Sequence, residues 1–198
     1  LSAGQGQAPA RQASFNAGLS ENVPAVTLNK MCGSGLKSVI YAHDQIKAGT
    51  SDLVAAGGME SMTNAPYLSP KMRAGARVGH QQMYDHMFLD GLEDAYEPGR
   101  LMGTYAEDTA ELFQFTREQQ DEYAIGSLNN ALNAQKENAF EKEISPVTIK
   151  TRKGEIIIKD DEQPKNAQPE KIPNLKPAFK KDGTVTAANS SSISDGAA

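Results

Sequence analysis

Apolar residues along the chain alternate between short strand-like runs and helical repeats. Residues 23–28 form a short run with β-branched members, typical of a strand. Four apolar residues then recur at helical spacing over residues 36–46, and Gly49 follows as a helix C-terminus would. A second apolar run, residues 52–56, ends at two glycines. A strand, helix, strand order predicts a parallel pair and an α/β fold class.

Three more helices are predicted from composition and capping signals. Residues 9–19 begin with a proline at the first turn and include a glycine stop, which predicts a short helix. Residues 104–107 (Thr-x-x-Glu) and 116–119 (Thr-x-x-Gln) match capping boxes, so each is expected to open a helix. The second of these helices is predicted to reach about residue 138.

The rest of the chain is less regular. Residues 61–100 lose periodicity, are rich in methionine and are too long for an idle loop, so we predict an interaction or lid segment. Residues 146–150 and 155–159 flank a short basic turn and predict a hairpin. The polar, proline-rich residues 160–177 predict an ordered linker, and residues 184–186 a last short strand.

Composition excludes several classes of protein. The 198 residues carry a net charge of −5, from 20 basic and 25 acidic residues, which argues against a nucleic-acid or membrane-surface binder. One cysteine excludes an intrachain disulfide and fits a reducing compartment, so a cytoplasmic location is expected. Organellar targeting stays open, because the first residue is Leu1 rather than methionine. No cluster of residues has metal-ligand spacing, and no metal is expected.

Cys32, the single cysteine, is the candidate nucleophile. It lies between the first strand-like run and the helix over residues 36–46, so it is expected on a strand-to-helix turn. The positive end of a helix dipole favours an anion, and the thiolate is the nucleophilic form of cysteine. Gly33 and Gly35 leave room for a reacting carbonyl to approach backbone N–H donors. A lone cysteine is often only a buried apolar residue, but such a residue needs neither these glycines nor a helix start.

The segment Asn29–Lys37 (Asn-Lys-Met-Cys-Gly-Ser-Gly-Leu-Lys) resembles the nucleophile segment of the thiolases, enzymes that make or cleave 3-ketoacyl-CoA. Further stretches agree with that family in order along the chain: residues 4–12, 56–62, 102–107 and 183–189, running into 194–198. Within the family the chain is most similar to the acetyl-CoA acetyltransferases.

This resemblance implies a thiolase-like layered αβαβα core, present in part, with an inserted α+β loop domain. Residues 1–61 would belong to the N-terminal core, residues 62–192 to the loop domain that covers CoA, and residues 193–198 to the return to the core. The chain is expected to be an internal piece, lacking the first strand-helix-strand and the C-terminal half. The catalytic histidine, the second cysteine and the catalytic asparagine of the family would lie outside it.

The resemblance also implies a reaction. The Cys32 thiolate would attack acetyl-CoA, and the acetyl-cysteine would then acylate a second acetyl-CoA to give acetoacetyl-CoA; thiolysis is the reverse. Coenzyme A is substrate and product, no further cofactor is implied, and the family forms homodimers and homotetramers. A degradative 3-ketoacyl-CoA thiolase stays open, because Leu101 stands where many acetoacetyl-specific enzymes have histidine. A truncated, non-catalytic CoA-binding or assembly fragment is the other alternative, and we expect the 198-residue chain alone to be inactive.

Further site residues follow only from the resemblance. Ser191 matches a serine that contacts pantetheine, Met102 a methionine that lines the acyl pocket, and Lys165 a basic residue near the CoA nucleotide. Positions that line pantetheine are matched by Leu92, Ala178, Phe179 and Ala187. Taken alone, each of these also fits plain packing, a serine-rich turn or a solvated lysine face. The histidines are not expected to act in catalysis, because none has the family's Gly-His-Pro setting; they are His43, His80 and His86.

Overall fold

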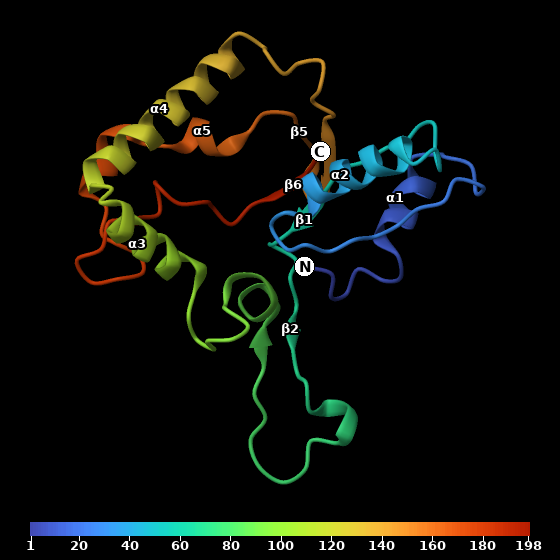
Figure 1. Cartoon of the computed structure of the whole chain (residues 1–198), viewed down its shortest axis with the longest axis horizontal. Helices are drawn as coiled ribbons and strands as arrows, with labels where there is room; N and C mark the ends of the chain where they lie inside the picture. The colour runs from blue at the N-terminus through green and yellow to red at the C-terminus, as the bar shows by residue number, and fades with distance from the viewer. The chain divides into compact units, whose positions relative to one another are not determined.

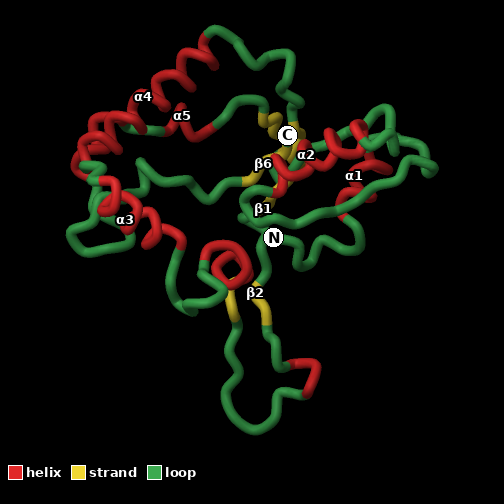
Figure 2. The backbone as a smooth tube through the Cα atoms, in the orientation of Figure 1, coloured by secondary structure: helices red, strands yellow, loops and turns green.

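The computed structural model describes all residues from 1 to 198. The chain divides into two compact units, and each is described by itself. The first unit comprises residues 1–102 and 193–198, and the second comprises residues 103–192. Figure 1 shows the course of the chain through both units, and Figure 2 shows that helices and loops account for most of it. The prediction of an inserted domain over residues 62–192 concerns the layered architecture of the family and stays a prediction.

The first unit combines short helices with two small sheets. Its elements are α1 (Pro9–Asn16), α2 (Ser34–Lys47), β1 (Met59–Ser61), β2 (Tyr67–Leu68), the 3-10 helix η1 (Met72–Ala74), β3 (Tyr84–Asp85), the π-helix η2 (Phe88–Leu92) and β6 (Asp195–Ala197). The strands β2 and β3 pair antiparallel and are joined by a long loop that carries η1. The helices predicted over residues 9–19 and from residue 36 onward are confirmed, the first ending three residues early.

The second unit is built on two helices and a hairpin. Its elements are α3 (Met102–Phe113, whose first residue belongs to the first unit), α4 (Arg117–Lys136), β4 (Val147–Thr151), β5 (Gly154–Ile158), α5 (Glu162–Asn166) and the 3-10 helix η3 (Pro169–Asn174). Helix α4 contacts both α5 and η3. The predicted hairpin is confirmed, with Val147 opposite Ile158 and Thr151 opposite Gly154.

The capping signals had different outcomes. The box at residues 116–119 is confirmed: Gln119 N–H donates to Thr116 Oγ1 at 3.2 Å, and Thr116 N–H donates to Gln119 Oε1 at 2.9 Å. The box at residues 104–107 is wrong, because α3 already begins at Met102 and Thr104 lies inside the helix. The C-terminus of α2 is confirmed, since Gly49 follows it with a φ of 70° and its N–H donates to Ile46 O at 3.1 Å.

Three predicted strands do not form. Residues 23–28, 52–56 and 184–186 carry no strand, and the expected parallel pair is absent, because all three sheets are two-stranded and antiparallel. A strand forms only beside a neighbouring strand that supplies its hydrogen bonds. No strand pairs with residues 23–28 or with residues 52–56. The third run is held by side chains instead of by a strand, as shown below.

Within the first unit, the pairing of β1 with β6 joins residues 59–61 to residues 195–197. Met59 pairs with Ala197 and Ser61 with Asp195. The pairing extends by one residue, because Gly58 N–H donates to Ala198 O at 2.8 Å and Ala198 N–H donates to Gly58 O at 3.0 Å. The two glycines that precede β1, Gly57 and Gly58, are therefore held by the last residue of the chain.

Asp195 is the residue through which we expect pH to act on this junction. Thr63 N–H donates to Asp195 Oδ1 at 3.0 Å, and this backbone hydrogen bond lowers the pKa of Asp195 below its ordinary value. The ionised group therefore stabilises the folded state above the unfolded-state pKa, and this contribution is lost as the pH falls through the lower folded-state pKa. Asp195→Asn is expected to lower Tm at neutral pH and to flatten the fall of Tm below about pH 4.

The measurement is calorimetry across pH, with Asp52→Asn, an exposed carboxylate in the loop after α2, as the control. Superimposable pH profiles of the Asp195→Asn variant and the parent protein would contradict the prediction.

Candidate functional site

The turn that carries Cys32 is held by the side chains on either side of it. Met31 N–H donates to Asn29 Oδ1 at 2.8 Å. The Ser34 hydroxyl accepts from Lys30 N–H at 2.9 Å and donates to Met31 O at 2.7 Å. These bonds act within six residues, so the local sequence alone can specify the turn.

Cys32 is exposed and lies immediately before the start of α2. Gly33 is the N-cap residue and Ser34 the first helical residue, which confirms that Cys32 lies just before a helix, although the strand expected before it does not form. Met31 has a φ of 47°, in the left-handed region that non-glycine residues seldom adopt. A strained residue next to a thiol at the positive end of a helix dipole is an arrangement typical of reactive sites.

Glycines let α2 approach the turn at residues 57–58. A Cβ on Gly58 would lie 3.2 Å from Gly35 Cα, and a Cβ on Gly57 would lie 2.5 Å from Ala198 O. The single hydroxyl hydrogen of Ser38 is shared between Gly35 O at 2.7 Å and Gly57 O at 2.9 Å, which joins the two segments. Gly58 thus has a packing role against α2 that the sequence did not reveal. The predicted role of Gly33 and Gly35 beside a reacting carbonyl stays a prediction.

Two further candidate residues belong to the first unit. Leu92 ends the π-helix η2, a rare element that often accompanies functional sites. Met102 is exposed at the start of α3. The structure shows no contact that assigns a ligand to either residue.

The remaining candidates lie in the second unit, and the structure brings some of them together. Ala178 N–H donates to Val185 O at 2.9 Å, so residues 178–179 run beside the segment that contains Ala187. The Phe179 ring lies against Gly103, where a Cβ would come within 2.4 Å of ring carbons. Ser191 is exposed at the end of the same segment, and Lys165 is exposed in the last turn of α5.

Glu107 is a buried carboxylate whose role the sequence did not indicate. Its side chain is 4% exposed, and its Oε1 accepts from Val185 N–H at 2.8 Å. Its Oε2 accepts from Thr184 N–H at 2.9 Å and from the Thr184 hydroxyl at 3.1 Å. A Cβ on Gly183 would lie 2.2 Å from the carboxylate, so only glycine fits there. The Glu107 carboxylate therefore supplies residues 184–185 with the hydrogen-bond acceptors that a neighbouring strand would have supplied.

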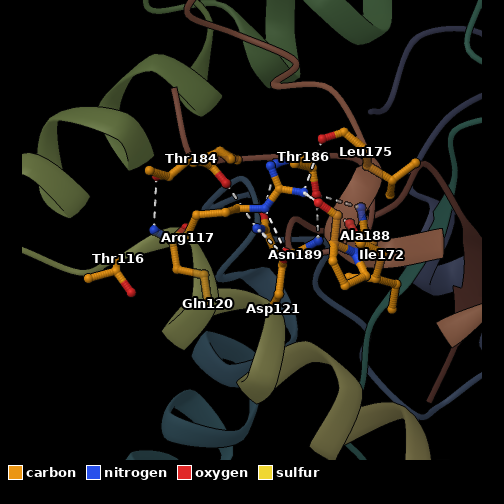
Figure 3. A network of polar contacts seen from close by, with 12 residues as sticks. Thr116, Arg117, Gln120, Asp121, Ile172, Leu175, Thr184, Thr186, Ala188 and Asn189 are labelled. Carbon is orange, nitrogen blue, oxygen red and sulfur yellow. Dashed lines mark hydrogen bonds and ion pairs between the residues drawn. The ribbon is translucent and has the colours of Figure 1, made fainter. Parts of the chain in front are cut away.

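A second buried carboxylate lies one helix further on. Asp121, 5% exposed, accepts from Arg117 Nε at 2.7 Å and from Asn189 Nδ2 at 3.0 Å (Figure 3). Gln120 Nε2 also reaches this region and donates to Thr184 Oγ1 at 2.9 Å. This network could not be predicted from the sequence. Its only local signal was the i, i+4 spacing of Arg117 and Asp121 on α4.

The histidines do not form a catalytic pair with Cys32 in this structure. His86 is buried, lies 2.6 Å from Asp90 Oδ2 through Nδ1, and accepts from Ala3 N–H at Nε2. Both ring nitrogens of His86 are therefore engaged in hydrogen bonds to other residues of the first unit. His43 lies exposed on α2 beside Asp44.

One ion pair joins α3 to the segment after η3. Lys180 Nζ lies 3.0 Å from Glu111 Oε2, and this hydrogen bond raises the pKa of Lys180. The pair is exposed on both sides, so its contribution to stability is small. No group of three or more histidine, cysteine, aspartate or glutamate side chains is arranged to hold a metal ion. No helix is both long enough and apolar enough to cross a membrane.

Comparison with known proteins defines the class to which this fold and site belong. The family model of the thiolase N-terminal domain matches residues 1–198. A probable acetyl-CoA acyltransferase of Staphylococcus aureus strain COL is 50% identical over 200 aligned residues, covering 100% of this chain and 51% of the relative. The chain therefore belongs to the thiolase family, and it spans about half the length of the curated relatives it matches.

Solved structures agree. The Acat5 thiolase of Ascaris suum, determined in complex with coenzyme A, matches with a TM-score of 0.89 and 44% identity over 99% of this chain and 50% of that one. An acetyl-CoA acetyltransferase of Syntrophomonas wolfei matches with a TM-score of 0.91 and 40% identity over 100% of this chain and 49% of that one. The predicted α/β class with thiolase-like architecture is confirmed.

Proposed function

We propose that this chain supplies the nucleophile half of a thiolase that transfers acyl groups between CoA thioesters through an acyl-Cys32 intermediate. The observation that carries the proposal is the position of Cys32, exposed on a side-chain-braced turn at the N-terminus of α2. Family membership over the whole chain supports it, as do relatives described as acetyl-CoA acyltransferases and a thiolase structure that contains coenzyme A.

The first chemical step follows from the chemistry of a thiolate. The Cys32 sulfur attacks the thioester carbonyl of acetyl-CoA, the carbon–sulfur bond to CoA breaks, and CoA leaves as a thiol after taking up a proton. Backbone N–H groups at a helix N-terminus stabilise negative charge, which suits the oxyanion that forms during attack. The acetyl group then remains on Cys32 as a thioester.

The second step we propose is a Claisen condensation. A second acetyl-CoA loses a proton from its methyl group, and the resulting carbanion attacks acetyl-Cys32 to give acetoacetyl-CoA and the free thiol. In this proposal the proton acceptor is a residue outside these 198, so the step is proposed for the whole protein. The reverse direction is thiolysis of acetoacetyl-CoA. A reduced thiol is required, which favours a reducing compartment such as the cytoplasm, and homo-oligomers are proposed from the family.

The second candidate function is that of a thiolase that accepts a broader range of acyl-chain lengths. Leu101 is half-buried and lies in a short backbone bridge with Glu93, directly before Met102. An apolar side chain at this position favours a degradative 3-ketoacyl-CoA thiolase that accepts longer acyl chains. Comparison of kcat/KM across 3-ketoacyl-CoA substrates of increasing length separates the two: a steep fall beyond four carbons supports the acetoacetyl-specific enzyme.

The proposal is tested by intact mass spectrometry of the protein that carries this sequence, before and after incubation with acetyl-CoA. The expected result is a gain of one acetyl group, located on Cys32 by peptide mapping and absent from Cys32→Ser. Met31→Leu, which changes the neighbouring residue without removing sulfur from position 32, serves as the matched control and should still be acetylated. A folded protein that binds coenzyme A without acetylation of Cys32 would instead support the non-catalytic alternative.

A further inference from the structure

Four of the predicted CoA contacts of the second unit lie on two segments without regular strand structure. Ala178 and Phe179 follow the 3-10 helix η3, and Ala187 and Ser191 lie on the segment 184–191. Such segments take a defined shape only if other groups hold them, because neither a helix nor a sheet supplies their hydrogen bonds. The groups that hold them therefore decide where these four residues lie.

Asn189 closes the second segment on itself. Its Oδ1 accepts from Thr186 N–H at 2.7 Å, and its Nδ2 donates to Thr184 O at 3.0 Å. The remaining Nδ2 hydrogen goes to Asp121 Oδ1 at 3.0 Å. Both donor hydrogens and the acceptor of this amide are thus used, two residues before Ser191.

Asp121 connects this loop to the other segment through Arg117. The carboxylate accepts from Arg117 Nε at 2.7 Å, while Arg117 Nη2 donates to Ile172 O at 2.9 Å and to Leu175 O at 3.0 Å. Figure 3 shows Asp121 and Arg117 reaching from α4 to both segments. Because α4 is a capped helix of 20 residues, it provides a rigid base for both.

We propose that Asp121 and Asn189 are positioning residues for coenzyme A, which set the shape of segments 172–179 and 184–191 without contacting the ligand. The inference rests on the proposed function, and on the pantetheine contacts that the family resemblance predicts at residues 178, 179, 187 and 191. It assigns a role to the partly buried Arg117–Asp121 ion pair and to the Asn189 amide, which the proposed reaction does not use. A network needed only for stability would leave CoA affinity unchanged in variants that still fold.

The central test is Asn189→Asp, a change of nearly equal size. The new carboxylate can still accept from Thr186 N–H, but it cannot donate to Thr184 O, and it faces the like charge of Asp121. We expect the Kd for coenzyme A, measured by calorimetry, and the KM for acetyl-CoA to rise at least about tenfold. We expect kcat to stay within about threefold, because an interaction that serves binding in the ground and transition states alike alters KM alone.

The matched control is Asn130→Asp, which adds the same charge at an exposed position of α4. It should leave Kd and KM unchanged. Hydrogen–deuterium exchange should show faster exchange of residues 184–191 in Asn189→Asp and not in the control. Iodoacetamide should alkylate Cys32 at the same rate in all three proteins.

A second variant tests whether Asp121 is the partner. Asp121→Asn added to Asn189→Asp restores an amide–carboxylate pair and removes the like-charge contact, so it should recover part of the lost affinity. Failure of this double variant to improve on Asn189→Asp would overturn the role of Asp121. If Asn189→Asp does not fold, Asp121→Asn alone replaces it, with an expected rise in Kd of about threefold from the weakened Arg117 contact.

The outcomes separate this inference from the proposed function. A parent protein that does not bind coenzyme A contradicts both. A parent protein that binds it, with unchanged affinity in the folded variants, overturns the positioning role and leaves the proposed function standing. Loss of affinity in Asn189→Asp with normal affinity in Asn130→Asp supports the inference, even if Cys32 is never acetylated.

Discussion

Replacing Cys32 with alanine is expected to lower the rate of acetoacetyl-CoA thiolysis by at least about 10⁴-fold in the complete enzyme. The variant keeps the turn, because the bonds that brace it come from Asn29 and Ser34 rather than from the thiol. It removes the only atom that can carry the acyl group, so no covalent intermediate can form. The measurement is the CoA-dependent loss of acetoacetyl-CoA by absorbance.

Ser34→Ala is the informative comparison for that experiment. It keeps the thiol but removes the bonds to Lys30 N–H and Met31 O, which hold the turn. Misplacement of the nucleophile should lower kcat by roughly tenfold, far less than the loss of sulfur. A Cys32→Ala enzyme that retained more activity than Ser34→Ala would contradict an acyl-cysteine mechanism.

Glu107→Ala is expected to lower the free energy of unfolding by about 3 kcal/mol. The carboxylate is buried and accepts from Thr184 N–H, the Thr184 hydroxyl and Val185 N–H. Its removal leaves buried donors without an acceptor, and this cost exceeds the loss of one ordinary hydrogen bond. The measurement is urea unfolding at neutral pH, with the midpoint and the slope fitted separately.

Glu111→Ala is the matched control, one turn further along the same helix. Its side chain is 70% exposed and pairs with an exposed lysine, so its removal should change stability by less than about 1 kcal/mol. Glu107→Gln should fall between the two, because its amide keeps one acceptor oxygen for three donors. Equal midpoints for Glu107→Ala and Glu111→Ala would show that the buried carboxylate does not hold residues 184–185.

Elements that depend on a few neighbouring residues could be predicted from the sequence. The capping box at Thr116, the end of α2 at Gly49 and the hairpin over residues 147–158 each involve contacts within one or two turns of chain. The turn at Cys32 belongs to the same group, since its bracing bonds span at most four residues. The position of Cys32 before a helix and the family could therefore be inferred before any coordinates.

Contacts between distant residues could not be predicted in this way. The Thr104 capping box was wrong because Glu107, its supposed capping residue, faces Thr184, 77 positions away. The strand expected at residues 184–186 failed for the same reason, since a carboxylate supplies the hydrogen bonds that a strand would have supplied. Likewise, the need for glycine at Gly57 and Gly58 follows from how closely separate segments pack against them.

By itself, then, the amino-acid sequence determined the local elements of this protein and the placement of Cys32 at a helix start. The tertiary structure alone decided which carboxylates are buried, and that Asp121 and Asn189 meet across 68 positions of chain. The physical reason is that propensity, capping and turn chemistry act over a few residues. Burial and hydrogen-bond partnership are properties of the folded arrangement, and helix periodicity places Glu107 and the exposed Glu111 on similar faces of α3.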